Sequence, residues 1–267
     1  NDINFLHIDK DGDLIVLTWG TGMRILKKGS VNFQNYHFNI GQSNSYFTSV
    51  ESSKIPNKLW IGTQESGLLS FDKLTGIFIH FEQSEKQGSI KGNHIFQVFE
   101  DTQKRIWVAT NGGGLCLFQP ETNTFKTWTT DDGLPNNTVK GILEDKHQNL
   151  WLATNEGLSE FLIRSNSFKN YTQADGLQGS EFLINAYAQN KSGEMFFGGT
   201  GGMNVFHPDS LRENNRVPPV YITGLRLFNK PVTIGQKDFP LQKDILATDE
   251  LTFEANQNVF SLEFTAL

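Results

Sequence analysis

Short apolar segments recur along this chain at a nearly constant distance, separated by turns rich in Gly, Asn and Asp. Five of these segments can be superposed on one large apolar or aromatic residue. The five central residues are Ile15, Trp60, Trp107, Trp151 and Phe196, spaced 45, 47, 44 and 45 residues apart. Self-similarity at such a period is typical of a repeat architecture.

Each repeat predicts four short β-strands. In the fourth repeat, apolar runs place strands at residues 139–143, 150–153, 158–162 and 168–171. A glycine follows each central residue by six or seven positions, where a tight turn joins the second and third strands. Four strands in about 45 residues make one propeller blade, and because one blade cannot bury both of its faces, successive blades stack. The predicted fold class is all-β, with five four-stranded blade repeats of a β-propeller.

The repeats also predict where the propeller ends. Blades span residues 1–212, and residues 213–267 form a second domain. The fifth repeat has only three clear strands, and the inner strand at residues 3–8 begins almost at residue 1. An open ring would expose strand edges and apolar faces, so we expect the five repeats to be part of a larger propeller with further blades upstream.

Composition excludes several classes of protein. The 267 residues carry 23 Lys and Arg against 29 Asp and Glu, a net charge of −6, which is the wrong sign for binding nucleic acid or an anionic membrane surface. No apolar run approaches the roughly 20 residues of a membrane helix, and no signal-peptide pattern is present. The single cysteine, Cys116, excludes an internal disulfide and a thiolate-rich zinc site, and its apolar neighbours predict burial.

Few residues have a pattern suited to catalysis or metal binding. The run Asp9, Asp11 and Asp13 has neither the glycine nor the glutamate spacing of a calcium loop, so we expect a β-turn. The glycine runs at 111–114 and 198–202 lack the lysine of a phosphate-binding loop. Loop carboxylates could converge as the acid pair of a glycosidase, but sequence cannot place them across a channel. They are Asp131, Asp132, Glu156, Asp175 and Glu181. We expect no catalytic residue, metal or cofactor.

Ligand binding is the remaining function, and loops on a rigid scaffold are its usual location. Strands two and four of a blade run parallel, so the turns that leave them open on the same face. There, amides, carboxylates and aromatic rings would suit a sugar. The candidate ligand-binding residues are Trp19, Asn111, Trp128, Asn136, Asn137, Asn155, Glu181 and Asn185. Two alternatives stay open: Trp19 as local packing rather than a stacking platform, and each asparagine as a turn former.

Residues 140–158 resemble the two-component regulator propeller repeat, and so do the segments at 131–137 and 174–182. Residues 197–208 resemble the last blade of such a sensor. The tail at 218–229 and 251–264 is similar to the start of the triple-tyrosine domain that follows these propellers. The chain departs from the pattern at Ile15, where the family has Trp, and at Gly199, where it has Thr.

The resemblance implies a function and a cellular location. Residues 213–267 would be the N-terminal part of an Ig-like β-sandwich. The chain would be the periplasmic sensor of a Bacteroidetes hybrid two-component histidine kinase, itself not an enzyme, and would detect a glycan-derived oligosaccharide. Its partners would be the transmembrane and kinase domains of the parent chain and a second copy in a homodimer. A propeller glycan hydrolase or lyase and a protein–protein scaffold remain alternatives.

Overall fold

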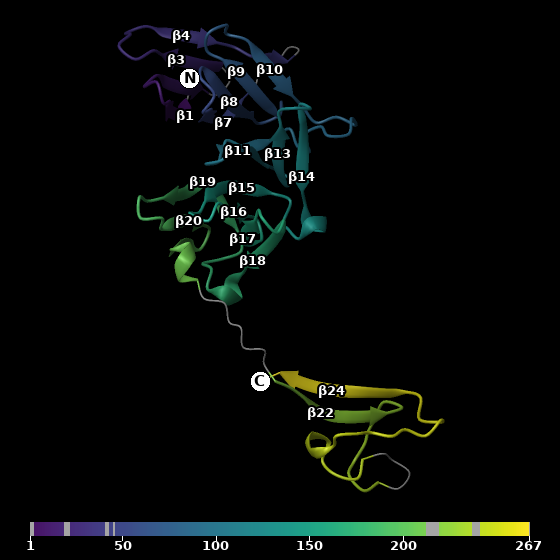
Figure 1. The fold of residues 1–267 in the computed structure, drawn as a ribbon. Helices are drawn as coiled ribbons and strands as arrows, with labels where there is room; N and C mark the ends of the chain where they lie inside the picture. The colour runs from purple at the N-terminus through teal and green to yellow at the C-terminus, as the bar shows by residue number, and fades with distance from the viewer. Residues whose placement is uncertain are drawn as a thin grey trace. The chain divides into compact units, whose positions relative to one another are not determined.

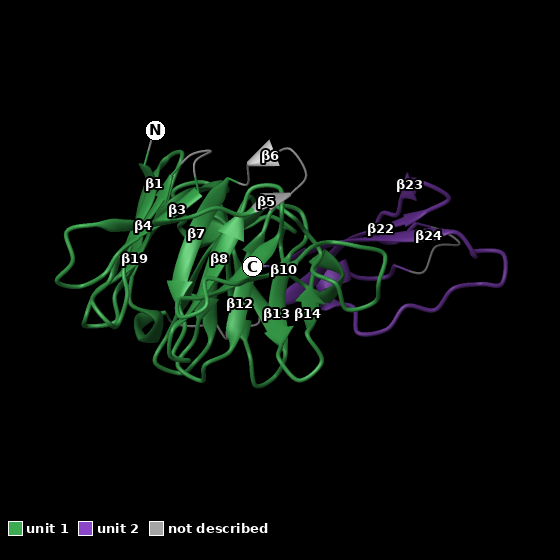
Figure 2. Cartoon of the chain, turned by 90° about the horizontal axis from the view of Figure 1, so that it is seen from above, with its two compact units in different colours: residues 1–211 green, residues 212–267 purple. Residues whose placement is uncertain are grey.

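A computed structural model describes residues 3–18, 22–40, 43–44, 46–211, 219–236 and 241–266. The chain separates into two compact units, residues 1–211 and residues 212–267, which Figure 2 shows in different colours. The described residues form antiparallel strands and four short 3-10 helices, so the predicted all-β class is confirmed.

In the described residues, unit 1 contains five antiparallel sheets of three or four strands, which follow one another along the chain (Figure 1). The first contains β1 (Ile3–Ile8), β2 (Leu14–Thr18), β3 (Gly22–Leu26) and β4 (Phe33–Tyr36). The second contains β7 (Phe47–Ser52), β8 (Lys58–Thr63), β9 (Leu68–Asp72) and β10 (Phe78–Phe81). The third contains β11 (Ile95–Glu100), β12 (Ile106–Thr110), β13 (Leu115–Gln119) and β14 (Thr124–Trp128).

The fourth sheet contains β15 (Val139–Glu144), β16 (Leu150–Thr154), β17 (Gly157–Leu162) and β18 (Ser167–Tyr171). The fifth has three strands: β19 (Phe182–Gln189), β20 (Met195–Gly199) and β21 (Gly202–Phe206). A short pair, β5 (Asn39–Ile40) and β6 (Ser43–Asn44), lies between the first two sheets in sequence. The connections contain the 3-10 helices η1 (Thr130–Asp132), η2 (Gln173–Asp175) and η3 (Pro208–Ser210). We refer to the five sheets as blades 1 to 5.

The central residue of each repeat lies in the second strand of its blade. Trp60, Trp107 and Trp151 are each only 1% exposed, and each packs against the inner strand of the next blade. Trp107, for example, shares a cluster with Val139 and Ile142 of β15. These rings therefore fill the space between neighbouring blades and join the sheets into one core.

The inner strands β1, β7, β11, β15 and β19 contact one another in chain order. Each carries a register shift, which in the first four blades comes at its second residue. In blades 1 and 2 the side chain of this residue reaches the following inner strand. Asn4 Nδ2 donates to the carbonyl of Phe47 at 2.7 Å, and Thr48 Oγ1 donates to that of Ile95 at 2.6 Å. In blade 4, Lys140 instead pairs with Glu181 at 3.0 Å.

An aspartate ties the central tryptophan to the turn that precedes its strand. Asp101 Oδ1 accepts from the amides of Gln103 and Arg105, and its Oδ2 accepts from Trp107 Nε1 at 2.8 Å. Asp145 does the same for Trp151, at 3.2 Å. The same carboxylate thus shapes the turn and satisfies a buried indole N–H.

Blades 1 and 2 each lack one member of this aspartate–tryptophan pair. In blade 2, Ser53 stands where the aspartate is expected, and Trp60 Nε1 has no hydrogen-bond partner among the described residues. In blade 1, where Ile15 replaces the tryptophan, the spare oxygen of Asp9 binds the buried ammonium of Lys73, which also reaches Asp11 and Asp13 at 2.9 and 3.0 Å.

The expected β-turn at Asp9–Asp13 is confirmed, because Asp9 Oδ1 accepts from the amides of Asp11 and Asp13. A lysine of the next blade balances these three carboxylates. Cys116 is fully buried, as predicted.

The two outermost faces of unit 1 are apolar and exposed. On β1, Ile3, Leu6 and Ile8 are 58–70% exposed. On blade 5, the exposed apolar side chains include Met203 and Val205. This agrees with the expectation of further blades, which stays a prediction.

Unit 2 is a three-stranded antiparallel sheet in the order β23-β22-β24, with β22 at Val220–Leu227, β23 at Lys230–Pro231 and β24 at Phe260–Ala266. The 3-10 helix η4 (Ile245–Ala247) contacts β22. Its buried apolar side chains in the described residues are Leu225, Leu227 and Leu241. So small a core fits the expectation of a partial sandwich.

Glu51 belongs to the inner strand β7 and is half-buried. Burial raises the pKa of Glu51 to about 7; the charge of Glu100 adds to this and that of Lys54 opposes it. Burial, together with the charge of Glu51, also raises the pKa of Tyr187 of blade 5. Tyr187 packs so closely on β15 that a Cβ at Gly141 would lie 2.3 Å from its ring.

The first prediction concerns the turn aspartate. We expect Asp101→Ala to lower the free energy of unfolding by about 3 to 5 kcal/mol, because it leaves an indole N–H, a guanidinium and two amides without their buried acceptor. Chemical denaturation measures this loss. The exposed Asp131→Ala should change stability by less than about 0.5 kcal/mol, and equal effects of the two variants would contradict the assignment.

The second prediction concerns pH. The folded chain holds the Glu51 proton more tightly than the unfolded chain does, so this group favours folding at low pH. That contribution is lost as the pH rises from about 4.5 through about 7. We therefore expect Glu51→Gln to match the wild type at pH 4 and to exceed its stability by about 2 to 3 kcal/mol at pH 8. Denaturation at both pH values checks this, with the exposed Glu121→Gln as control; a gain that is the same at both would refute the origin in Glu51 ionisation.

Candidate functional site

In blades 2, 3 and 4, the turns that leave the second and fourth strands lie on one face, as predicted. The amide of Gly114, in the turn after β12, donates to the carbonyl of Asn137, in the connection after β14, at 2.8 Å. The same bond joins Gly67 to Asn93 and Gly157 to Ser180. We call this face the rim.

Three of the candidate ligand-binding asparagines form hydrogen bonds within the rim. Asn136 Oδ1 accepts from the Thr138 amide and its Nδ2 donates to Glu156. Asn137 Oδ1 accepts from the Thr130 amide at 2.8 Å, and Asn111 Oδ1 from Thr138 Oγ1 at 3.3 Å. The structure therefore brings three of the predicted asparagines together, but their contacts favour the turn-former alternative.

The other predicted residues are scattered. Glu181 pairs with Lys140, and Asn185 lies in β19 with a φ of 58°. Asn155 keeps a buried Oδ1 that has no partner among the described residues. Trp19 lies outside the described residues.

Trp128 requires a correction. Its side chain is 4% exposed and packs on Trp107 and Phe161, and its Nε1 donates to Asn166 at 2.9 Å. The ring is part of the core between blades 3 and 4, so it is not available as a stacking surface for a ligand. The last residue of an outer strand can face inward, and the sequence pattern did not distinguish this.

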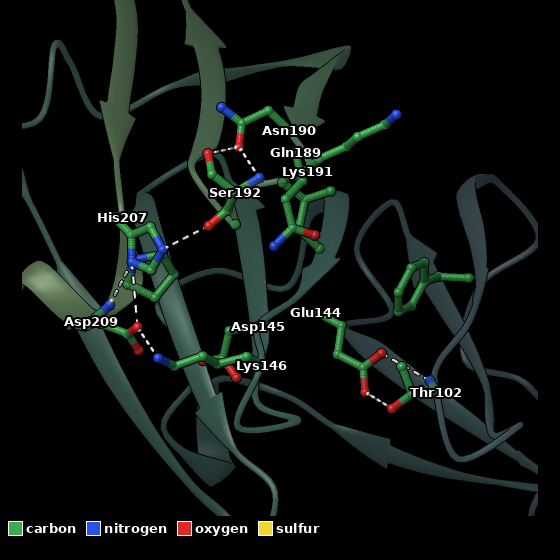
Figure 3. A pocket seen from close by; sticks show the side chains of 14 residues that line it. Thr102, Glu144, Asp145, Lys146, Gln189, Asn190, Lys191, Ser192, His207 and Asp209 are labelled. Atoms are coloured by element: carbon green, nitrogen blue, oxygen red, sulfur yellow. Dashed lines mark hydrogen bonds and ion pairs between the residues drawn. The ribbon is translucent and has the colours of Figure 1, made fainter.

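A pocket that sequence analysis missed opens on the opposite side of the blades, where the inner strands end (Figure 3). It has a volume of about 420 Å³. Its apolar walls are Phe99 of β11, Leu143 of β15 and Pro208 of η3. The polar lining residues are Thr102, Glu144, Asp145, Lys146, Gln189, Asn190, Lys191, Ser192, His207 and Asp209.

The repeated turn after each inner strand positions these polar groups. Asn190 in blade 5 occupies the place of Asp145 in blade 4, and its Oδ1 accepts from the amides of Ser192 and Glu194. Lys146 and Lys191 directly follow these two turn residues. The rigid turns therefore present one lysine each at the pocket.

The carboxylates of the pocket already have partners. Both oxygens of Glu144 accept from Thr102, at 2.7 and 2.8 Å. The buried carboxylate of Asp145 accepts hydrogen bonds from two amides of its own turn and from the indole of Trp151. Asp209 pairs with Lys146 and with His147 Nε2 at 2.9 Å; the Lys146 hydrogen bond is the main cause that lowers the pKa of Asp209.

The serine and histidine side chains of the pocket do not contact each other. Ser192 Oγ donates to Asn190, while His207 Nε2 contacts the main-chain carbonyl of Ser192 at 3.0 Å. Serine and histidine therefore do not form a nucleophile–base pair.

In the described part of the chain, no group of three His, Cys, Asp or Glu side chains could hold a metal ion. Among those same residues, no helix has the length and apolar character that spanning a membrane requires.

Comparison with known proteins identifies the repeats. The model of the two-component regulator propeller matches residues 89–112 and 133–156. Histidine kinase P4 of Formosa agariphila is 34% identical over 274 residues, which cover 84% of this chain and 20% of that protein. The chain thus spans about a fifth of the length of this relative.

Solved structures share the fold. The extracellular domain assigned to a one-component system of B. thetaiotaomicron matches 99% of this chain and 40% of its own, with 16% identity and a TM-score of 0.62. The Swd1 β-propeller domain of Myceliophteria thermophila matches 80% of this chain and 68% of its own, with 11% identity and a TM-score of 0.55. Five sheets joined by large second-strand residues, the matched repeats and the related histidine kinase lead to one identification: the chain contains two-component regulator propeller repeats, and its residues 1–211 have a β-propeller fold.

Proposed function

We propose that this chain is the periplasmic ligand-sensing region of a hybrid two-component histidine kinase/response regulator. The observation that carries the proposal is the 34% identity to a histidine kinase over 84% of the chain, combined with regulator propeller repeats. The kinase and transmembrane domains would lie elsewhere in the parent protein. The shared fold with an extracellular domain of a one-component system supports the location outside the cytoplasm.

Unit 2 would be the start of a triple-tyrosine β-sandwich and would pass the signal toward the membrane. Its small core in the described residues supports a domain that continues beyond this part. Signalling requires that ligand binds one arrangement of the propeller, or of a homodimer, better than another.

The ligand would be a glycan-derived oligosaccharide, bound without turnover. The pocket of about 420 Å³ combines apolar walls with the amide of Gln189 and with lysines, which suits the two faces of a sugar ring. Its carboxylates are committed to hydrogen bonds within the protein, which supports a binding role rather than acid–base catalysis.

The test is thermal unfolding of the complete extracytoplasmic region of the parent protein with a panel of oligosaccharides. One glycan class should raise the midpoint by several degrees, because a ligand at 100 times its Kd adds about 2.7 kcal/mol. The glycan should be recovered intact. Gln189→Ala in the pocket should abolish the shift, whereas Asn155→Ala on the rim should retain it.

Other outcomes would favour the alternatives. Cleavage of the glycan would indicate a hydrolase or lyase. Loss of the shift in Asn155→Ala but not in Gln189→Ala would move the binding site to the predicted rim. If no glycan shifts the unfolding midpoint, the proposal that the chain senses oligosaccharides would be contradicted, and a protein–protein scaffold would be favoured.

A further inference from the structure

On the pocket side of the propeller, three pairs of neighbouring blades are bridged from the same turn position, two by a lysine and one by a threonine. The residue after the first turn position reaches the next blade. Lys10 Nζ donates to the carbonyl of Lys54 at 3.3 Å, and Lys54 Nζ donates to the carbonyl of Asp101 at 2.5 Å. Thr102 in blade 3 completes the series by its two bonds to Glu144 of blade 4.

Between blades 4 and 5 the equivalent residue is diverted. Lys146 occupies the place of Lys10 and Lys54, but its ammonium pairs with Asp209 of η3 (Figure 3). His147 also contacts Asp209, at 2.9 Å. The 420 Å³ pocket lies at this unbridged position. We call the contacts of Lys146 and His147 with Asp209 the latch.

The latch closes on the last element of unit 1. Asp209 lies in η3, which ends at Ser210, and unit 2 begins at residue 212. Apart from the latch, His207 holds η3 by its contact with Ser192, and His207 Nδ1 also lies 3.6 Å from Asp209 Oδ2. The amide bonds of Ser210 and Leu211 lie within the η3 segment itself. The position of η3 therefore depends in part on Asp209 retaining its cations.

The charge of the pocket favours an anion. Its carboxylates are committed, as described above, and Lys191 has no ion-pair partner among the residues that the structure describes. The Lys146 side chain is 65% exposed. Solvent-exposed ion pairs contribute little, with a median of about 0 to 1 kcal/mol, so an anionic ligand can compete with Asp209 for Lys146.

We propose that this pocket binds an acidic sugar residue, whose anionic group takes Lys146 from Asp209 and is also contacted by Lys191. The carboxylate of a uronic acid and a sulfate ester share this chemistry. The C–H face of the sugar ring would lie on Phe99 and Leu143. Release of the latch then loosens η3 where the chain passes on to unit 2. This proposal rests on the proposed sensor function and adds the ligand class and the coupling element.

Because the ligand and Asp209 compete for Lys146, substitutions of the lysines and of Asp209 should change ligand affinity in opposite directions. Removing a cation, by Lys146→Met or Lys191→Met, should weaken binding of the acidic ligand. Removing the competing anion, by Asp209→Asn, should strengthen it, because ligand and Asp209 oppose each other reciprocally. A side chain that merely supported the pocket would weaken binding when changed, whatever its charge.

The experiment is calorimetric titration of the complete extracytoplasmic region with uronic-acid-containing and sulfated oligosaccharides, each beside its neutral counterpart. Acidic members should bind at least tenfold more tightly than neutral ones. Lys146→Met and Lys191→Met should each reduce this affinity at least fivefold, and Asp209→Asn should increase it severalfold. Lys243→Met, which removes a lysine paired with Asp249 in unit 2, should leave it unchanged.

Hydrogen exchange measures the release of the latch. The amides of Ser210 and Leu211, which donate to the carbonyls of His207 and Pro208, should exchange faster when the acidic ligand is bound. Unchanged exchange on binding would overturn the coupling.

Equal affinity for acidic and neutral members, or weaker binding by Asp209→Asn, would overturn the acidic-ligand proposal but leave the sensor function standing. No binding by any member would overturn both.

Discussion

The second strand of each blade carries a large side chain that must be buried against the next blade, and the rest of unit 1 is organised around this requirement. A tryptophan fills the space well, but its indole N–H has to be satisfied away from water. In blades 3 and 4 a single aspartate accepts that N–H and also the amides of its own turn. The same aspartate therefore supports both the packing between blades and the geometry of the turn.

Blades 1 and 2 show what happens when one part of this solution changes. With Ile15 in place of the tryptophan, the carboxylate of Asp9 is free to bind Lys73 of the neighbouring blade. With Ser53 in place of the aspartate, Trp60 still packs between blades, and Lys58 lies over its ring at 4.4 Å. Burial of the apolar surface is retained in both cases, while the polar partner is what varies.

The sequence was sufficient for the architecture because the period and the central aromatic residues directly reflect packing between blades. It was weaker for the site. Trp128 stands at a strand end, where the pattern does not tell an inward ring from an exposed one, and the rim asparagines could equally form turns or bind ligand. The pocket was missed because it arises from an exception: Lys146 looks like Lys10 and Lys54 in sequence, and its diversion depends on Asp209, 63 residues later. The lysines that follow the turn residues were the one sequence feature that pointed to the pocket. They indicate a site only once the fold shows which of them lie close together.

The register shift at the start of the inner strands of blades 1 and 2 has a consequence for how such chains can change over time. In blades 1 and 2 the displaced side chain binds a main-chain carbonyl of the following blade rather than one of its side chains. Every residue type offers that acceptor. A blade joined in this way places no demand on the identity of its neighbour's residue, so blades can diverge, be duplicated or be exchanged without a compensating substitution next door.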